Sequence, residues 1–202
     1  SIYPDFDYSL QFLTRRCIRN CEFCLVPKKE GLIHKVIPLE TKEDSKYRKL
    51  LDNNFFAYKD WKTNIEILKS YDKKIEFNQG IDLRLMNESQ AKALSTLKIK
   101  TIYTAFDHYK DKDKILKGLE ILTKNIKPYK ITTYVLIGFD STPEEDLERV
   151  MLLKEMGVNP FAMAYNKMND YQKAFARWVN HKATFKSVPY DETYKYYVKG
   201  SY

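Results

Sequence analysis

Short apolar segments alternate with helix-periodic segments about six times along the chain. The predicted strands cover residues 8–14, 49–53, 74–78, 101–106, 131–137 and 160–165. Residues 133–139 are apolar without alternation, which is typical of strands buried on both faces of a parallel sheet. Repeated strand–helix units predict an α/β fold with right-handed crossovers. Six units predict a partial, open (β/α)6 barrel of the TIM type, because a closed barrel of this type has eight.

The predicted helices have recognisable ends. In the clearest case Thr142 caps the helix, Pro143 takes its first position, Glu145 completes a capping box and Gly157 offers a stop. The apolar residues of this helix keep helical spacing at Leu147, Val150, Met151 and Leu153. Further helices are predicted from near Asn87, over residues 60–70 and 113–124, and around Tyr171, Phe175, Trp178 and Val179. Functional groups are therefore expected in the loops that follow the strands.

The composition indicates one globular domain. The chain has 202 residues, of which 44% are apolar and 31% are charged. It contains neither an apolar stretch long enough to cross a bilayer nor a signal peptide, so we expect a cytoplasmic protein without membrane contact. All three cysteines lie within eight residues, an odd and clustered set that argues against a disulfide framework and favours metal binding.

The cysteines form the pattern CxxxCxxC at Cys17, Cys21 and Cys24, directly after the first predicted strand. Three thiolates on one loop can bind three corners of a [4Fe–4S] cluster and leave the fourth iron open to a small molecule. A structural zinc site would need a fourth ligand, for which His34 is the only nearby histidine. A conventional electron carrier would need a fourth cysteine, which the chain lacks.

This pattern, with Phe23 before the last cysteine, resembles the signature of the radical S-adenosylmethionine (SAM) superfamily. The resemblance covers residues 8–166 and implies that a cluster on the three cysteines cleaves SAM reductively. The resulting 5′-deoxyadenosyl radical would then abstract hydrogen from a second substrate. Phe23 matches a position whose ring and backbone lie near the adenine of SAM.

The resemblance also implies roles for residues at the ends of the second and third strands. In place of the Gly-Gly-Glu segment that holds the SAM amino group, this chain has Asp52, Asn53 and Asn54. At the end of the third strand the amides of Asn78 and Gln79, the acid Asp82 and the guanidinium of Arg84 lie close in sequence, and Asn78, Gln79 and Arg84 are predicted to contact SAM. Arg84 could bind the SAM carboxylate, or it could pair with Asp82 in the structure.

Later strand ends supply the remaining predicted contacts. Asp107 matches in charge a position that binds the ribose of SAM, and His108 either contacts substrate or forms an ordinary hydrogen bond. Residues 134–141 resemble a segment that supports adenine, which places Ile137 and Gly138 beside the base. In this segment Tyr134 and Ser141 replace the usual glycine and glutamate. Tyr165 and Asn166, after the sixth strand, are predicted to line the substrate pocket.

Residues 1–166 are predicted to form the core, with the cluster loop at residues 15–33, and residues 167–202 to form a helical tail packed on the barrel. The tail, which includes Trp178, Tyr190, Tyr194, Tyr196 and Tyr197, resembles one found on short radical SAM proteins of bacteria and their phages.

The net charge is +8, and residues 15–35 hold six cations against two acids. This predicts an anionic substrate, with a preference for a nucleotide or nucleic acid, and an acidic electron donor such as flavodoxin or ferredoxin. A lysine-rich solvated surface is the alternative. The alternative functions are a SAM-binding module without turnover and a zinc-stabilised nucleic-acid-binding protein.

Overall fold

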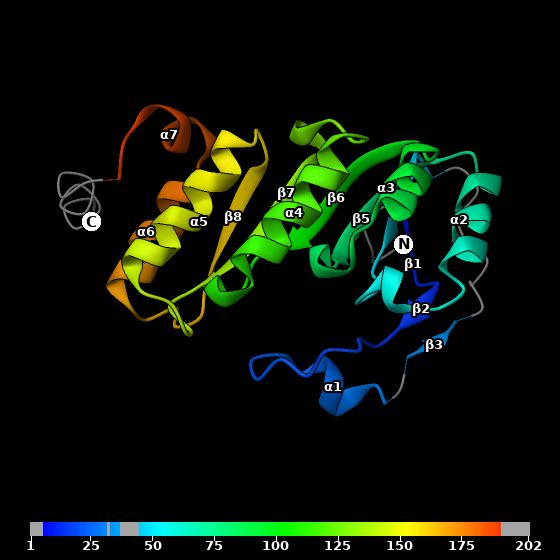
Figure 1. Ribbon diagram of the computed structural model, residues 1–202, viewed down its shortest axis with the longest axis horizontal. Coiled ribbons are helices and arrows are strands. Elements are labelled where there is room, and N and C mark those ends of the chain that lie inside the picture. The colour runs from blue at the N-terminus through cyan, green and yellow to red at the C-terminus, as the bar shows by residue number, and fades with distance from the viewer. Residues whose placement is uncertain (1–5, 32, 37–44, 191–202) are drawn as a thin grey trace. The chain divides into compact units, whose positions relative to one another are not determined.

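The computed structural model of the protein describes residues 6–31, 33–36 and 45–190 (Figure 1). The chain divides into two compact units. The first comprises Ser1–Ala105 and Lys114–Ile131, and the second comprises Phe106–Asp113 and Thr132–Tyr202. Six strands form a parallel sheet in the order β1-β4-β5-β6-β7-β8, so the predicted α/β class is confirmed. The predicted boundary at residue 166 stays a prediction.

The strands of the parallel sheet are β1 (Tyr8–Gln11), β4 (Tyr47–Leu50), β5 (Lys74–Ile81), β6 (Ile99–Ala105), β7 (Ile131–Ile137) and β8 (Asn159–Ala164). A separate antiparallel pair joins β2 (Thr14–Arg15) to β3 (His34–Lys35). The helices are α1 (Val26–Lys29), α2 (Trp61–Ser70), α3 (Glu88–Ser95), α4 (Lys112–Thr123), α5 (Pro143–Glu155), α6 (Asp170–Asn180) and α7 (Lys182–Ser187).

The six predicted strands all exist, and the prediction for β7 is correct at both ends. The segment predicted as one strand over residues 8–14 is divided into β1 and the start of β2. The predicted cap and capping box at Thr142 are confirmed, and the helix predicted from near Asn87 begins there, with Asn87 forming a second capping box. The β2–β3 pair and the short helices α1 and α7 were not predicted, because two-residue strands and one-turn helices leave no periodicity to detect.

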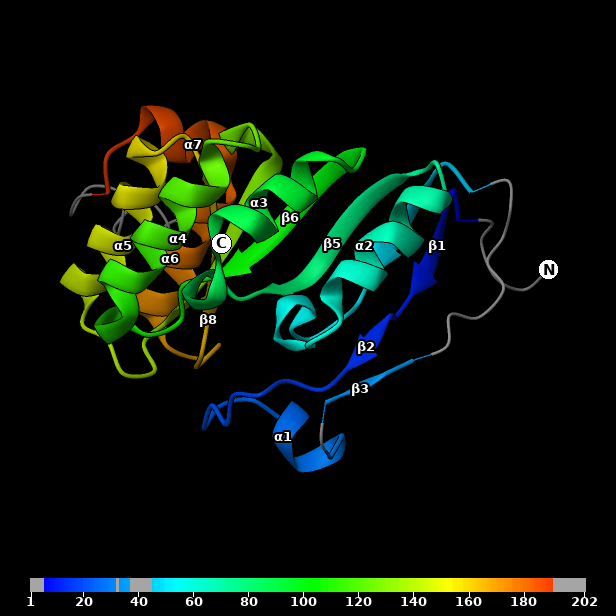
Figure 2. The ribbon, with the colours of Figure 1, turned by 45° about the vertical axis from the view of Figure 1, so that its right-hand side comes forward.

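In the first unit, helices α2 and α3 lie on one side of the parallel strands β1, β4, β5 and β6 (Figure 2). The covered side forms a core in which Phe55 and Phe77 are buried and pack ring edge to ring face, with centroids 5.2 Å apart. Phe55 belongs to a 3₁₀ turn, Phe55–Ala57, that directly follows the end of β4. Burial of this ring therefore fixes the position of the preceding residues, Asn53 and Asn54.

In the second unit, β7 and β8 pair in parallel and α6 packs against β8. The side-chain amide of Asn180 accepts a hydrogen bond from the Ala162 backbone N–H at 2.9 Å and donates one to its carbonyl at 3.0 Å. These bonds satisfy strand groups at Ala162 that β7 does not use. Tyr190 packs against the rings of Phe175 and Trp178, which favours a role in this core over base stacking. The other tail tyrosines, Tyr194, Tyr196 and Tyr197, lie outside the described residues.

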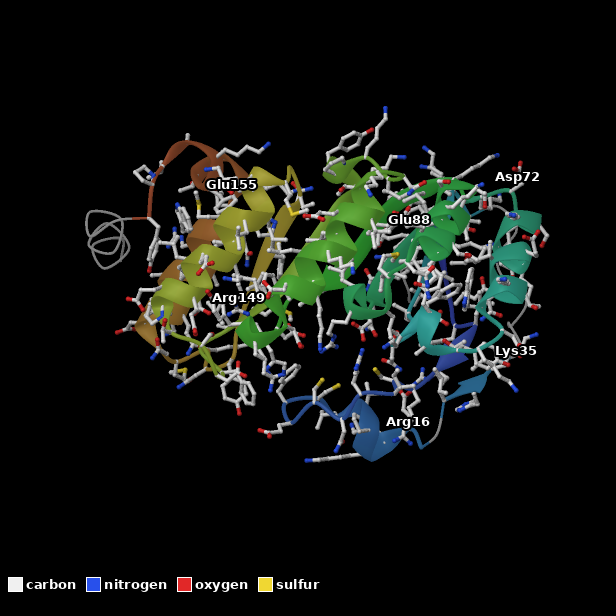
Figure 3. The ribbon with its side chains drawn as sticks, in the orientation of Figure 1. Arg16, Lys35, Asp72, Glu88, Arg149 and Glu155 are labelled. Carbon is white, nitrogen blue, oxygen red and sulfur yellow. The ribbon has the colours of Figure 1, made fainter. Side chains whose placement is uncertain are left out.

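Arg149 projects from α5 and is completely buried (Figure 3). Its Nη1 donates to the carbonyl oxygens of Phe106 and Asp107, at 2.7 and 2.9 Å, and its Nη2 donates to that of Leu136 at 3.0 Å. Buried Asp146, one helical turn earlier, balances its charge. The guanidinium therefore fixes the chain at the end of β6 to the end of β7 within this unit.

The residues that α5 buries therefore differ from the apolar residues that the sequence predicts for its buried face. Its buried residues are Asp146, Arg149, Val150 and Leu153, whereas Leu147 and Met151 are half-buried.

We expect Arg149→Met to lower the free energy of unfolding by about 3–5 kcal/mol, because it leaves Asp146 as a buried, uncompensated charge. Chemical denaturation followed by circular dichroism measures the loss. Arg177→Met is the matched control, since Arg177 is exposed on α6 and its replacement should change stability by no more than about 0.5 kcal/mol. A loss at position 149 equal to that of the control would contradict the assignment.

Candidate functional site

The three cysteines lie on a loop of the first unit that has little hydrophobic support. Cys17, Cys21 and Cys24 are half-buried and form no disulfide, and the Cys24 N–H donates to the Cys21 carbonyl at 3.0 Å in a turn. Among the described residues between 15 and 36, no side chain is fully buried. The conformation of this loop must therefore come from polar contacts, and three carboxylates provide them.

Asp52, after β4, holds the chain where it enters the loop. Its buried carboxylate accepts hydrogen bonds from the backbone N–H groups of Leu13 and Thr14, at 3.1 and 2.5 Å, and from the Thr14 hydroxyl at 2.7 Å. Burial raises the pKa of Asp52, although these hydrogen bonds oppose the shift. This carboxylate, one of the groups predicted to hold the SAM amino group, thus accepts its hydrogen bonds from the chain itself.

Glu30 joins the two ends of the loop. Its carboxylate pairs with the Arg15 guanidinium and accepts a hydrogen bond from the Arg16 backbone N–H at 2.9 Å. It also accepts one from the side-chain amide of Asn53, at 2.9 Å, which links the loop to the end of β4. Figure 3 labels Arg16 at this position.

Asp82, after β5, holds the middle of the loop. Its carboxylate is 8% exposed and accepts hydrogen bonds from the Nε of Arg19 at 2.9 Å and the Nε of Arg84 at 2.8 Å. Burial opposes the ionisation of Asp82, but the hydrogen bonds and charges of Arg84 and Arg19 outweigh it and lower its pKa. Of the two roles predicted for Arg84, the structure shows the ion pair.

The sulfur of Cys17 accepts two N–H donors, from the Arg19 backbone at 3.4 Å and the Asn54 side-chain amide at 3.3 Å. The same Asn54 nitrogen lies 3.3 Å from Asp82 Oδ2. Asn54 is 1% exposed, and its Oδ1 has no hydrogen-bond partner among the described residues. A buried carbonyl oxygen without a partner is costly, which marks this atom as a candidate acceptor for a ligand.

Gly80 permits the ends of β4 and β5 to approach each other. It has φ of +44°, and a Cβ at this position would lie 1.8 Å from the carbonyl oxygen of Asn53. Both the positive φ and the close approach of this carbonyl exclude a side chain at position 80. On the same strand Asn78 is half-buried and Gln79 is exposed. The first unit thus brings Asn53 and Asn54 to the cysteine loop, and no hydrogen bond described here joins Asn78 or Gln79 to it.

The donor set fits an iron–sulfur cluster, since the three thiols lie on one loop and Cys17 already accepts two N–H···S bonds. Phe23 is half-buried between Cys21 and Cys24. Among the described residues, no group of three or more His, Cys, Asp or Glu side chains is arranged to hold a metal ion. Because metal binding is coupled to local folding, a cluster on these thiols would require them to turn toward one another.

The other predicted residues lie in the second unit, where two buried side chains organise them. Arg149 binds the Asp107 carbonyl, as described above. Gln172 of α6 donates to the Gly138 carbonyl at 3.4 Å and accepts from the Asn166 backbone N–H at 2.8 Å. Ile137, the last residue of β7, is fully buried. Ser141, which stands where the superfamily segment has glutamate, donates to Asp146 at 2.6 Å.

His108 belongs to an aromatic group in the second unit. Its Nδ1 lies 2.6 Å from Asp140 Oδ2, and its ring centroid lies 6.0 Å from that of Phe139. The Phe139 and Tyr165 centroids are 4.8 Å apart. The loops after β6, β7 and β8 therefore meet here, as expected for the carboxyl ends of parallel strands.

Sequence reasoning missed several residues that organise both units: Arg19, Glu30, Asp140, Asp146, Arg149 and Gln172. Three of them left a signal in the sequence. Glu30 is one of two acids in a segment with six cations, and Asp146 and Arg149 are opposite charges spaced for the same helix face.

Comparisons with known proteins leave the family open, because no protein-family model and no curated protein matches the chain. Within the described part of the chain, no helix is long and apolar enough to span a membrane.

Stability should depend on pH through Asp82. Its folded-state pKa is lowered, so its contribution is present above the unfolded-state pKa of about 3.9 and is lost as pH falls through the folded value. We expect Asp82→Asn to lower the free energy of unfolding by about 2 kcal/mol near neutral pH. This difference from the unsubstituted protein should shrink as the pH falls below the unfolded-state pKa.

Denaturation series at several pH values measure the difference. Asp72→Asn is the control. Asp72, like Asp82, forms an ion pair, in this case with Lys98, but its side chain is exposed. That variant should be nearly as stable as the unsubstituted protein at neutral pH. A difference for Asp82→Asn that stays constant with pH would contradict the role of the carboxylate charge.

Proposed function

We propose that this protein is a radical SAM enzyme that binds a [4Fe–4S] cluster through Cys17, Cys21 and Cys24. It cleaves SAM reductively to methionine and a 5′-deoxyadenosyl radical, which abstracts hydrogen from a second substrate. The fold that this proposal implies is an open, partial barrel of the radical SAM type, and the cysteine loop follows the first strand, β1. The observation that carries the proposal is the loop itself: three cysteines without a disulfide, one of them accepting two N–H···S hydrogen bonds.

A cluster held by three cysteines supplies an electron and an iron coordination position that no protein ligand fills. The chain's own residues hold the loop and its ligands in place. Asp52 fixes the entry to the loop, Glu30 closes its base and Asp82 holds Arg19. Held in this way, the loop keeps the thiols at the end of the sheet where parallel α/β proteins bind ligands.

Within the first unit, Asn54 is the best candidate acceptor for the amino group of SAM. The carboxylate of Asp52 is occupied by Leu13 and Thr14, whereas Asn54 Oδ1 has no partner in the described part of the chain. An ammonium group is a strong donor and would satisfy this buried oxygen. The proposed contacts of Asp107, Ile137 and Gly138 with ribose and adenine rest on the resemblance alone.

After anaerobic reconstitution with iron and sulfide, the protein should contain about four iron and four sulfide ions per chain. With SAM and dithionite it should form 5′-deoxyadenosine, which chromatography detects. Single Cys→Ala variants at positions 17, 21 and 24 should lose the cluster spectrum and the product, because no other cysteine exists to replace a ligand.

His34→Ala separates this proposal from a zinc site. The His34 side chain is exposed on β3, so its removal should leave the iron content unchanged. A preparation containing one zinc, lost on substitution of His34, would instead support a zinc-stabilised nucleic-acid-binding protein. A complete cluster that binds SAM without 5′-deoxyadenosine formation would indicate a SAM-binding module.

For the substrate, we propose an anion, with a nucleotide or nucleic acid preferred, and for the reductant an acidic protein such as flavodoxin or ferredoxin. The support is the basic loop, although Arg15 and Arg19 are paired with Glu30 and Asp82 and contribute less than a residue count suggests. Labelled oligonucleotides and nucleotides should bind at low salt, and the affinity should fall as salt rises. No detectable binding at low salt would exclude the nucleic-acid preference.

A further inference from the structure

We propose that Asn54 is a positioning residue that sets the reduction potential of the cluster through its hydrogen bond to the sulfur of Cys17. The proposal rests on the proposed function, because it requires that Cys17 bind the cluster. It assigns to Asn54 a role that is separate from contact with SAM, since the hydrogen bond uses the amide nitrogen rather than the oxygen.

The amide nitrogen of Asn54 lies between two acceptors. It is 3.3 Å from Cys17 Sγ and 3.3 Å from Asp82 Oδ2, so its two hydrogens can serve both. The residue is 1% exposed, and water therefore competes little for either bond. Phe55, which follows it, is fully buried, and this fixes the backbone from which the amide projects.

Asp82 couples Asn54 to the second donor on the same sulfur. The Arg19 backbone N–H lies 3.4 Å from Cys17 Sγ, and the Arg19 guanidinium binds Asp82 at 2.9 Å. Arg84, two residues after Asp82, also binds this carboxylate, and its Nε donates to Asp82 Oδ1 at 2.8 Å. Both donors to the sulfur are thus anchored on one buried carboxylate, whose negative charge also orients the Asn54 dipole with its nitrogen inward.

The sign of the effect follows from electrostatics. Reduction adds an electron that is shared with the thiolate sulfurs, so a donor stabilises the reduced state more than the oxidised state. Hydrogen bonds to the sulfurs are one of the factors that set cluster potentials. Loss of the Asn54 donor should therefore make the potential more negative and make the protein harder to reduce.

The test is a redox titration of the reconstituted protein without SAM, followed by electron paramagnetic resonance (EPR). Asn54→Leu keeps the approximate side-chain volume and removes the donor. It should lower the equilibrium constant for one-electron reduction about three- to tenfold, a tenfold change being about 59 mV. Asn54→Ser is the second variant and should shift the potential in the same direction, because the shorter side chain cannot reach the sulfur. If the leucine variant fails to fold, the smaller serine side chain still allows the potential to be measured.

Asn53→Leu is the matched control. Asn53 is the adjacent asparagine and its amide binds Glu30 at 2.9 Å, so it supports the same loop without donating to Cys17. This variant should keep the potential of the unsubstituted protein. Equal shifts for both positions would overturn the proposal by showing a general loosening of the loop.

Failure of the proposed function and failure of the role proposed for Asn54 give different results. If the unsubstituted protein forms no cluster, the proposed function fails. If it forms a cluster whose potential is the same with asparagine, leucine or serine at position 54, only the role of Asn54 fails. A lower melting temperature at an unchanged potential would give Asn54 a structural role alone and would likewise overturn the inference.

Discussion

The hydrogen bonds between three carboxylates and the cysteine loop are the interactions on which the rest of the first unit depends. A loop in which none of the described side chains is buried gains little from the hydrophobic effect, and ordering its backbone costs about 1–2 kcal/mol per residue. Asp52, Glu30 and Asp82 offset part of this cost, and each contacts a different part of the loop. Two of them are located by strand ends, Asp52 after β4 and Asp82 after β5, so the rigid sheet determines where the loop lies.

In the second unit, too, polar side chains hold the loops in place, but the residues are of a different kind. There a buried cation, Arg149, binds the carbonyl groups of the chain after β6 and within β7, and Gln172 joins the loops after β7 and β8. In both units polar side chains on regular elements fix irregular segments. This is the arrangement expected where ligands bind, because loops carry the functional groups and the scaffold must hold them in place.

The repeating elements were predictable from the sequence and the contacts that organise the loops were not. β7 was predicted to the residue because its segment is rich in β-branched and apolar residues and contains no charged side chain, and α5 because Thr142 and Pro143 mark its start. The start of β4 was predicted two residues late, since Tyr47–Leu50 contains two adjacent charged residues, Arg48 and Lys49, and resembles the flanking segment. The roles of Glu30 and Asp82 depend on partners 14 and 63 positions away, which no local pattern encodes.

The candidate site likewise has parts that the sequence predicts and parts that it does not. A local motif identifies the three cysteines, and strand ends bring Asn53 and Asn54 to their loop. Asp52 is one of three residues predicted to hold the SAM amino group, and its buried carboxylate also binds Leu13 and Thr14, which is a structural role. Charge and position alone could not separate these two roles, because both place a carboxylate at the end of β4.

The central claim is that three cysteines hold a cluster with an iron that remains open to SAM. The most direct measurement is the EPR spectrum of the reduced, reconstituted protein before and after the addition of SAM labelled with ¹⁵N at its amino group and ¹⁷O at its carboxylate. The account predicts a changed spectrum with hyperfine coupling to both labels. A cluster whose spectrum is indifferent to SAM, or a protein that assembles no cluster, would contradict it.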